Sequence, residues 1–456
     1  DCNQRSIGQR GRQVLDKLIP LLICHLEQSQ SEASTLTRVL LVIGKIVTRT
    51  AYIELLFENE GALKHLIKLC SASSWVTEHI AKYPILLDEL IDPKLLHNPP
   101  ALSSYKVELR EIMLRIPEDD LEAQMDCLRQ FKQAQQLRIA AGDISLVLPI
   151  TKVSDHLTAL AEAIIAEVIN LAWQHMSQRF GVPKSTLGNN NKGFSVIGYG
   201  KMGGLELGYS SDLDLVFLHN SDQSELTTGE RQIHASQFYM KLAQRILHIF
   251  NTRMSSGILY ELDMRLRPSG NSGLLAIHIN TFEQYQLEDA WTWEHQALVR
   301  ARMIYGESAL QQKFTKIRQQ ILSLPREKTA LHKNVVEMRD KMRRHLDKSN
   351  AELSDIKQGR GGLVDIEFLA QYLVLLHSNK LESIRGFSDN ISIFNQLYRD
   401  KVITLEQKES LIQGYCHLRD RGHQLTLQNE RLLISSEEFA QLSGGVADIW
   451  PKFMEQ

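Results

Sequence analysis

The sequence predicts a mostly helical α+β fold in which one small mixed sheet has helical segments before and after it along the chain. Three observations support this prediction: helical periodicity fills residues 10–180, strand-like apolar runs are confined to about residues 193–305, and helical periodicity returns beyond residue 306. The composition, 43% hydrophobic and 23% charged over 456 residues, is that of a folded globular protein with two to four domains.

The leader is predicted to form two helical segments. Three prolines between residues 92 and 100, Pro93 among them, interrupt the helical spacing of its apolar residues. We therefore expect an N-terminal helical segment of residues 1–100, with a regulatory or linking role, and a second helical segment of residues 101–192 that leads into the core.

A catalytic α/β domain is predicted over residues 193–305. A glycine- and asparagine-rich stretch, residues 188–193, reads as a surface loop before it. Apolar and β-branched runs then predict four strands, with one amphipathic helix between the second and the third. The expected strands are residues 194–197, 213–218, 258–264 and 274–277, and the expected helix is residues 230–250.

A helical bundle is predicted for residues 306–456, where apolar residues again recur three and four apart. Leu331, Val335, Met338 and Met342 show this spacing. The bundle would pack against the catalytic domain that precedes it.

Charge and hydropathy limit the partners that we expect. The formal net charge of −2 gives no global attraction to a polyanion, so nucleic acid is not an expected partner. No apolar run approaches the roughly 20 residues needed to cross a bilayer, and the N-terminus lacks a signal-peptide pattern. We expect a cytoplasmic protein without a membrane partner. Because the first residue is Asp1, we also expect the chain to be part of a longer protein.

The informative motif is a glycine-rich turn followed by Asp212-Leu213-Asp214 at the start of an apolar strand. Glycines after a strand allow backbone N–H groups to approach a phosphate, although such a turn alone is a weak signal. Side chains two apart in a strand project from the same face, so the carboxylates of Asp212 and Asp214 should point together. A bare Asp-x-Asp pair is otherwise most often a solvated strand start.

A third carboxylate, Asp263, is expected on a neighbouring strand. Adjacent carboxylates repel each other unless a cation lies between them, and hard oxygen ligands suit Mg²⁺. The sequence therefore predicts that Asp212, Asp214 and Asp263 form the catalytic and metal-binding centre of an Mg²⁺-dependent nucleotidyltransferase. Two metal ions about 3.5–4 Å apart would activate the attacking oxygen and stabilise the leaving pyrophosphate.

Nucleotide and phosphate binding is predicted for six residues around these carboxylates. Guanidinium groups bind phosphate bidentately, which makes the two arginines after Asp263 candidates, while the lysine and serine could equally be solvated or shape the turn. The predicted set is Lys201, Gly203, Gly204, Ser211, Arg265 and Arg267.

Two further groups are expected to be structural. Arg300 and Arg302 are placed in a predicted helix with Trp291, where bracing of the adjoining bundle is favoured over nucleotide contact. Asp365 and Glu367 lie two apart and cannot share one helical face well, so capping or packing beside the preceding glycines is the favoured role.

These motifs resemble the DNA polymerase β-like nucleotidyltransferases, and within them the bacterial glutamine synthetase adenylyltransferases. The resemblance rests on LGYSSDLDL and its glycine-rich approach together with four later segments, over about half of the chain. The matching segments are residues 198–219, 255–275, 291–306, 359–375 and 388–394.

The resemblance implies a polymerase β-like domain and transfer of AMP from ATP to a tyrosine of glutamine synthetase. In that family two homologous halves add and remove AMP, and this chain resembles the C-terminal, adenylylating half. It implies Mg²⁺ as cofactor, glutamine synthetase as protein substrate, PII protein and glutamine as effectors, and Asp263 as a candidate base for the tyrosine hydroxyl.

Other functions remain open at this point. The chain could be the deadenylylating, phosphorolytic half or a related uridylyltransferase. It could be a catalytically inert regulatory module that binds PII protein or glutamine, although three intact carboxylates argue against inertness. A nucleotidyltransferase acting on tRNA or DNA would bind polynucleotide with a steep salt dependence.

Overall fold

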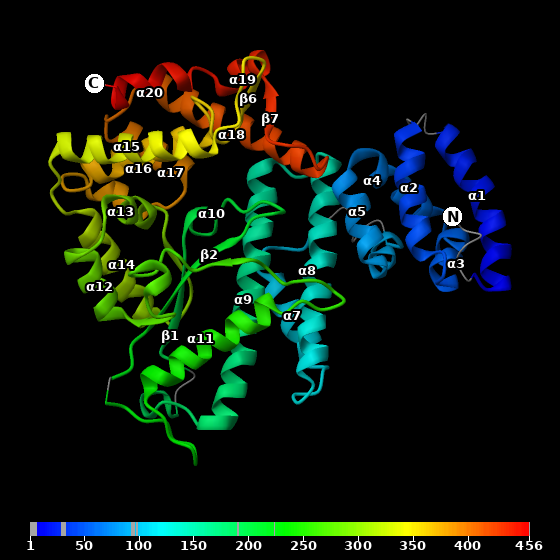
Figure 1. The fold of residues 1–456 in the computed structure, drawn as a ribbon, viewed down its shortest axis with the longest axis horizontal. Helices are drawn as coiled ribbons and strands as arrows, with labels where there is room; N and C mark the ends of the chain where they lie inside the picture. Colours follow the sequence, from blue (N-terminus) through cyan, green and yellow to red (C-terminus); the bar gives the residue numbers. More distant parts are fainter. Residues whose placement is uncertain are drawn as a thin grey trace. The chain divides into compact units, whose positions relative to one another are not determined.

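Helices make up most of the chain in the computed structural model, and strands gather mainly in its central region (Figure 1), which confirms the predicted mostly helical α+β class. The structure describes residues 7–28, 33–92, 96, 99–188, 191–222 and 224–455. The predicted break at Pro93 and two residues of the predicted loop, Asn189 and Asn190, lie outside the described residues.

The chain divides into two compact units. One consists of Asp1–Leu160 with His423–Arg431, and the other of Ala161–Gly422 with Leu432–Gln456. The boundaries of the four segments expected from the sequence stay predictions.

The first unit is helical throughout its described residues. Side-chain caps set two of its helix starts: Ser73 accepts from the amide of Val76 at 3.0 Å, and Asp120 accepts from the amide of Ala123 at 2.9 Å. Its elements are α1 (Gln9–Gln28), α2 (Ala33–Ile46), α3 (Thr50–Glu58), α4 (Glu60–Ala72), α5 (Ser74–Lys82), η2 (Pro84–Leu90), α7 (Ser104–Met113), α8 (Leu121–Ile144) and the start of α9 (Ile150–Phe180).

Helix α9 is the one described helix whose length and composition would suit a membrane span. Its most apolar window has a mean hydropathy of 1.3, but 78% of that window is buried within the protein. Burial of this kind is typical of the core helix of a soluble protein.

The second unit contains a five-stranded mixed sheet. Strands β3, β2, β1 and β5 follow one another across it, and β4 pairs with the far end of β2. The strands are β1 (Phe194–Gly198), β2 (Leu213–His219), β3 (Leu262–Asp263), β4 (Ala276–His278) and β5 (Arg302–Tyr305). Strand β1 is antiparallel to β2 and β5, whereas β3 and β4 are parallel to β2.

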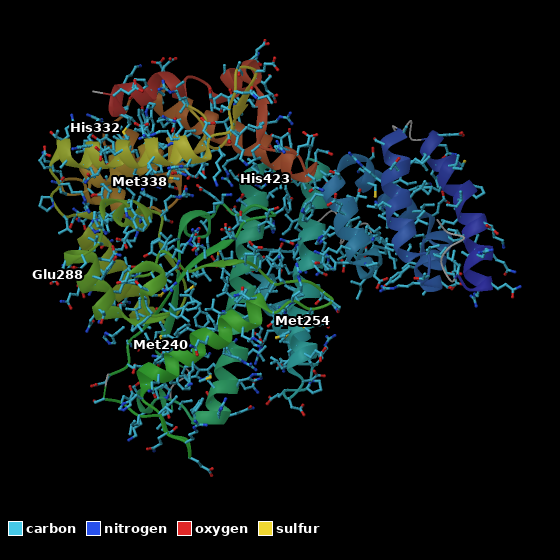
Figure 2. All side chains as sticks on the ribbon, in the orientation of Figure 1. Met240, Met254, Glu288, His332, Met338 and His423 are labelled. Atoms are coloured by element: carbon cyan, nitrogen blue, oxygen red, sulfur yellow. The ribbon has the colours of Figure 1, made fainter. Side chains whose placement is uncertain are left out.

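Helices cover this sheet through apolar contacts. Helix α11 (Ala235–Asn251) is the helix predicted over residues 230–250, and it begins five residues later than predicted. Its Met240, labelled in Figure 2, accepts a hydrogen bond at 3.5 Å from the amide of Ala276 in β4. Helices α12 (Ile279–Glu288) and α14 (Ser308–Leu322) place Phe282 and Phe314 in one buried cluster with the sheet. Close packing against the apolar side chains of these helices therefore makes the sheet rigid.

The predicted strands were right in place but not always in length. The third is reduced to two residues of the expected 258–264, because only Leu262 and Asp263 pair with β2. The prediction that Arg302 lies in a helix was wrong. Helix α13 (Thr292–Val299) ends at Arg300, and Arg302 begins strand β5 beside β1.

The C-terminal part of the second unit is mostly helical and contains a small two-stranded sheet. His332 of α15, labelled in Figure 2, contacts the ring of Tyr372 of α16 edge-on at 6.0 Å. The elements are α15 (Lys328–Leu346), β6 (Leu353–Asp355), α16 (Leu363–His377), η5 (Glu382–Gly386), α17 (Asn390–Arg399), α18 (Leu405–Leu427), β7 (Leu433–Ser435), α19 (Ser436–Ser443) and α20 (Val446–Met454). Three short helices lie elsewhere in the unit: η3 (Lys184–Thr186), α10 (Gly200–Gly203) and η4 (Gly270–Ser272).

A buried histidine at the end of β2 makes the stability of this unit depend on pH. His219 stacks on Tyr239 at 4.8 Å, lies 5.5 Å from His278 and shares a 3.0 Å hydrogen bond with Ser221. Burial, and secondarily the charge of His278, lowers the pKa of His219 to about 3. Below about pH 6.5 the unfolded chain binds a proton here that the folded chain does not, so acid destabilises the fold.

We therefore expect His219→Asn to weaken the loss of stability between pH 6.5 and pH 5. Wild type should lose up to about 1.4 kcal/mol per pH unit more than the variant over this range. Urea unfolding followed by circular dichroism at several pH values measures the difference. Parallel curves for the two proteins would contradict this role.

Candidate active site

The structure brings the three predicted carboxylates together at one end of the sheet. Asp214 of β2 and Asp263 of β3 are register partners on adjacent parallel strands, so their side chains share a face. Asp212 lies just before β2, two residues from Asp214, and is near enough for its charge to act on Asp214. Residues about fifty positions apart in sequence thus form one acidic group.

Mutual repulsion is visible in the electrostatics of this group. Burial, followed by the charges of Asp212 and Asp263, raises the pKa of Asp214 to about 6, although Lys201 and Arg265 act against the shift. A raised carboxylate pKa means that the ionised form lacks enough compensating positive charge. A cation beside Asp214 would supply that charge.

Asp263 is turned toward a neighbouring arginine. The Nε–H of Arg265 donates to its two carboxylate oxygens at 3.0 and 2.8 Å, the Arg265 amide donates at 2.9 Å, and Nη2 also donates. These hydrogen bonds from Arg265 are the main reason that the pKa of Asp263 is lowered. The Arg265 side chain is itself 73% exposed, so it is free to turn toward a ligand.

The donor chemistry of these three residues fits a hard divalent cation. Their carboxylate oxygens are the ligands that Mg²⁺ prefers. Among the residues that the structure describes, no three His, Cys, Asp or Glu side chains stand in a ready metal-binding arrangement. In the structure the Asp263 carboxylate is instead hydrogen-bonded to Arg265.

Arg267 has a different environment from the one that the sequence suggested. Its side chain is buried, and its guanidinium donates to the carbonyl oxygens of Met264, Asn271 and Gly273 at 2.7–3.1 Å. These bonds hold the loop after β3 in shape. In this conformation Arg267 braces the loop and does not present its donors to a phosphate.

The glycine-rich turn forms the short helix α10 directly above β2. The amides of Gly203 and Gly204 donate within this turn, to the carbonyls of Tyr199 and Gly200 at 2.9 and 3.0 Å. A side chain at Gly203 would overlap the carbonyl of Arg300. The two glycines predicted to bind phosphate are thus already used in packing, and a phosphate role for them stays a prediction.

The remaining two predicted residues lie at the edges of this turn. Ser211 accepts from the amide of Gly208 at 3.0 Å and so shapes the loop before β2. Lys201 reaches the surface next to the acidic group. Its surroundings lower its pKa by burial and by the nearby Lys357, while Glu367 and Asp212 counteract this shift.

Sequence reasoning missed the buried ion pairs behind the turn. Arg300 contacts Glu206 and also Glu367, the latter at 2.8 Å. Glu206 lies inside the glycine-rich motif, but no role was assigned to it from the sequence. Its position three residues after Gly203 was the one feature that could have indicated a contact beside the turn. Asp365 instead binds Arg339 at 2.6 Å and the amide of Gly361 at 2.8 Å, which confirms its predicted structural role.

One glycine of the turn is in direct contact with the acidic group. Gly200 has φ +53°, and a Cβ atom there would lie 2.6 Å from Oδ2 of Asp214. We expect Gly200→Ala to lose about 1 kcal/mol from the left-handed backbone and to reduce catalysis at least tenfold by displacing that carboxylate. Steady-state kinetics and thermal unfolding measure the two effects.

Gly445→Ala is the matched control for this substitution. Gly445 has φ +83° and no atom within 4 Å of the added methyl group, so it carries the backbone strain without the contact. Equal activity losses in the two variants would contradict the proposed displacement of Asp214.

Two family models match the sequence. One, described as glutamate-ammonia ligase adenylyltransferase, matches residues 63–317, which is more than half of the chain and includes the whole acidic group. The other, described as GlnD PII-uridylyltransferase, matches residues 329–436 in the C-terminal bundle.

Proposed function

The chain belongs to the glutamate-ammonia ligase adenylyltransferase family, whose members are nucleotidyltransferases that act on glutamine synthetase, and on this premise we propose that it transfers AMP from ATP to a tyrosine of that enzyme. The observation that carries the proposal is the convergence of Asp212, Asp214 and Asp263 within the matched region. A half-buried carboxylate such as Asp214 beside two like charges costs stability, so its presence favours a catalytic role.

The proposed reaction is an in-line displacement at the α-phosphorus of ATP. The tyrosine oxygen forms a bond to phosphorus, the bond to the β-phosphate oxygen breaks, and pyrophosphate leaves. Tyrosine has a pKa near 10, so its hydroxyl needs a proton acceptor at neutral pH. We assign that role to a carboxylate oxygen of Asp263 once Arg265 has released it.

Each residue of the site then has a physical task. Asp212, Asp214 and Asp263 would hold Mg²⁺, which when bound neutralises phosphate charge and lowers the barrier to hydroxyl attack. The exposed side chain of Arg265, just after β3, would leave Asp263 and bind the departing phosphates. Lys201 adds positive charge at the opposite edge of the turn.

We propose the forward direction, AMP addition, because LGYSSDLDL and WTWEHQ resemble the adenylylating half of the family. The alternative is removal of AMP by phosphate. PII protein and glutamine are proposed effectors, and the cytoplasm is the proposed location.

Intact-mass spectrometry of glutamine synthetase tests the proposal. The enzyme is incubated with this chain, Mg²⁺ and ATP, in parallel with a variant carrying Asp212→Ala and Asp214→Ala. One added AMP per subunit that disappears with the variant supports AMP addition. Loss of AMP from a pre-modified subunit, on addition of phosphate, would reverse the direction. No change in either assay would favour a regulatory module that lacks catalysis.

A further inference from the structure

A buried arginine connects the glycine-rich turn to the C-terminal bundle. Arg300 follows helix α13 and is only 2% exposed. Its guanidinium lies between Glu206, which follows the turn, and Glu367 of α16, with Nη1 2.8 Å from Oε1 of Glu367. Burial alone would lower the pKa of this arginine, but Glu367, together with Tyr415 and Asp389, more than offsets that effect and raises it. The Arg300 guanidinium is therefore charged, and a glutamate contacts it on each of two sides.

The glycines of the turn are shaped to this arginine. A Cβ atom at Gly204 would lie 2.6 Å from Nη2 of Arg300, and one at Gly203 would overlap the Arg300 carbonyl. Only residues without a side chain allow the turn to approach Arg300 this closely. The packing of Arg300 therefore requires both glycines that the sequence associates with phosphate: its backbone requires Gly203 and its side chain requires Gly204.

The same turn is fixed to the catalytic strand and to the bundle. The amide of Tyr199 donates to the carbonyl of Asp214 at 2.9 Å, which ties the turn to β2. From the other side, Ser388 donates to the carbonyl of Gly203 at 2.9 Å, and the Asn390 side chain donates to Glu206 at 3.2 Å. A shift of the bundle helices would thus move the turn that lies over Asp214.

We propose that Arg300 is a positioning residue for nucleotidyl transfer: it holds the glycine-rich turn over β2, and Glu367 of α16 anchors it to the C-terminal bundle. This inference rests on the proposed function. Arginine suits the task because its planar fork reaches two carboxylates at once, which the single ammonium of lysine does not.

Arg300→Lys tests this role, since it keeps the charge but loses the fork. Arg339→Lys is the matched control: Arg339 is equally buried and pairs with Asp365 at 2.6 Å, but it lies in the bundle away from the turn. Both variants should melt at lower temperature. Well below those temperatures, only Arg300→Lys should lower kcat for AMP transfer, by about 10–100-fold, as expected when reacting groups are misplaced.

A double-mutant comparison separates packing from phosphate binding at Gly204. If Gly204 is needed to make room for the Arg300 side chain, then Gly204→Ala should lower kcat strongly in wild type but have at least fivefold less effect in the Arg300→Lys background. If Gly204 instead binds a phosphate, the kcat losses of Gly204→Ala and Arg300→Lys should multiply in the double variant. Gly203→Ala, which would strike the Arg300 backbone, should be as harmful in both backgrounds.

Two outcomes would overturn the inference. One is an Arg300→Lys enzyme with the kcat and ATP KM of wild type. The other is independent, multiplicative effects at Gly204 and Arg300. Absence of AMP transfer by wild type itself would instead reject the proposed function, so the two failures are distinguishable.

Discussion

Asp214→Asn is expected to abolish AMP transfer, by at least about 10³-fold, while making the metal-free protein more stable. The loss follows because the carboxylate at the centre of the acidic group disappears. The gain follows because asparagine has nearly the same shape but removes the charge that Asp212 and Asp263 repel. The stabilisation should be about 1–2 kcal/mol at pH 7.5, after allowance for solvent screening.

The sign is fixed by the raised pKa of Asp214. The folded chain holds this proton more tightly than the unfolded chain, so stability falls as pH rises from 3.8 to about 6, and the full cost of the ionised carboxylate is present above that pH. Thermal unfolding in EDTA, with and without the substitution, measures the effect. Glu261→Gln, an exposed carboxylate just before β3, should change neither activity nor melting temperature. An Asp214→Asn protein less stable than wild type would contradict the repulsion.

Asp365→Ala is expected to give the largest loss of stability, about 3–5 kcal/mol. The Asp365 carboxylate is 1% exposed and accepts from Arg339 at 2.6 Å, from Arg343 at 2.9 and 3.0 Å, and from the amide of Gly361 at 2.8 Å. Removal of a buried carboxylate leaves an uncompensated buried guanidinium, and that cost exceeds the worth of the original pair.

Chemical unfolding monitored in the C-terminal bundle measures this loss. Glu337→Ala is the control, because Glu337 is 65% exposed and lies 3.9 Å from Lys333 on the same helix, where ion pairs contribute little. A change at Asp365 no larger than the change at Glu337 would show that the buried arginines find other partners.

The sequence predicted the acidic group because the chemistry itself imposes a pattern. Asp212 and Asp214 lie two residues apart at the start of one strand, and Asp263 lies in a later strand, so the pattern can be recognised in the sequence. The pairing of Asp214 with Asp263 on adjacent strands agrees with it. Strand β5 left no such signature. Its four residues are all half-buried, and they follow a helix with only Arg300 and Ala301 between them.

Long-range packing explains the other differences. Arg267 reads as a phosphate ligand in sequence because the composition of a motif does not reveal which carbonyls surround a guanidinium. The association of Gly203 and Gly204 with Arg300 joins residues almost one hundred positions apart, and no periodicity encodes it. Asp365 was easier to assign, because its partners include the neighbouring Gly361.

The acidic group is divided between parts of the sheet that differ in how firmly they are held. Asp214 belongs to a seven-residue strand paired on both sides, whereas Asp263 ends a two-residue strand paired only with β2. Segments with few ladder hydrogen bonds open locally at little free-energy cost, without unfolding the rest of a protein. Amide hydrogen exchange around Asp263 would therefore be fast while β1 and β2 stay protected. In the catalytic centre that we propose, Asp263 would thus separate from Asp212 and Asp214 whenever β3 opens, and ligands that bridge β2 and β3 would lengthen the time that the three carboxylates spend together.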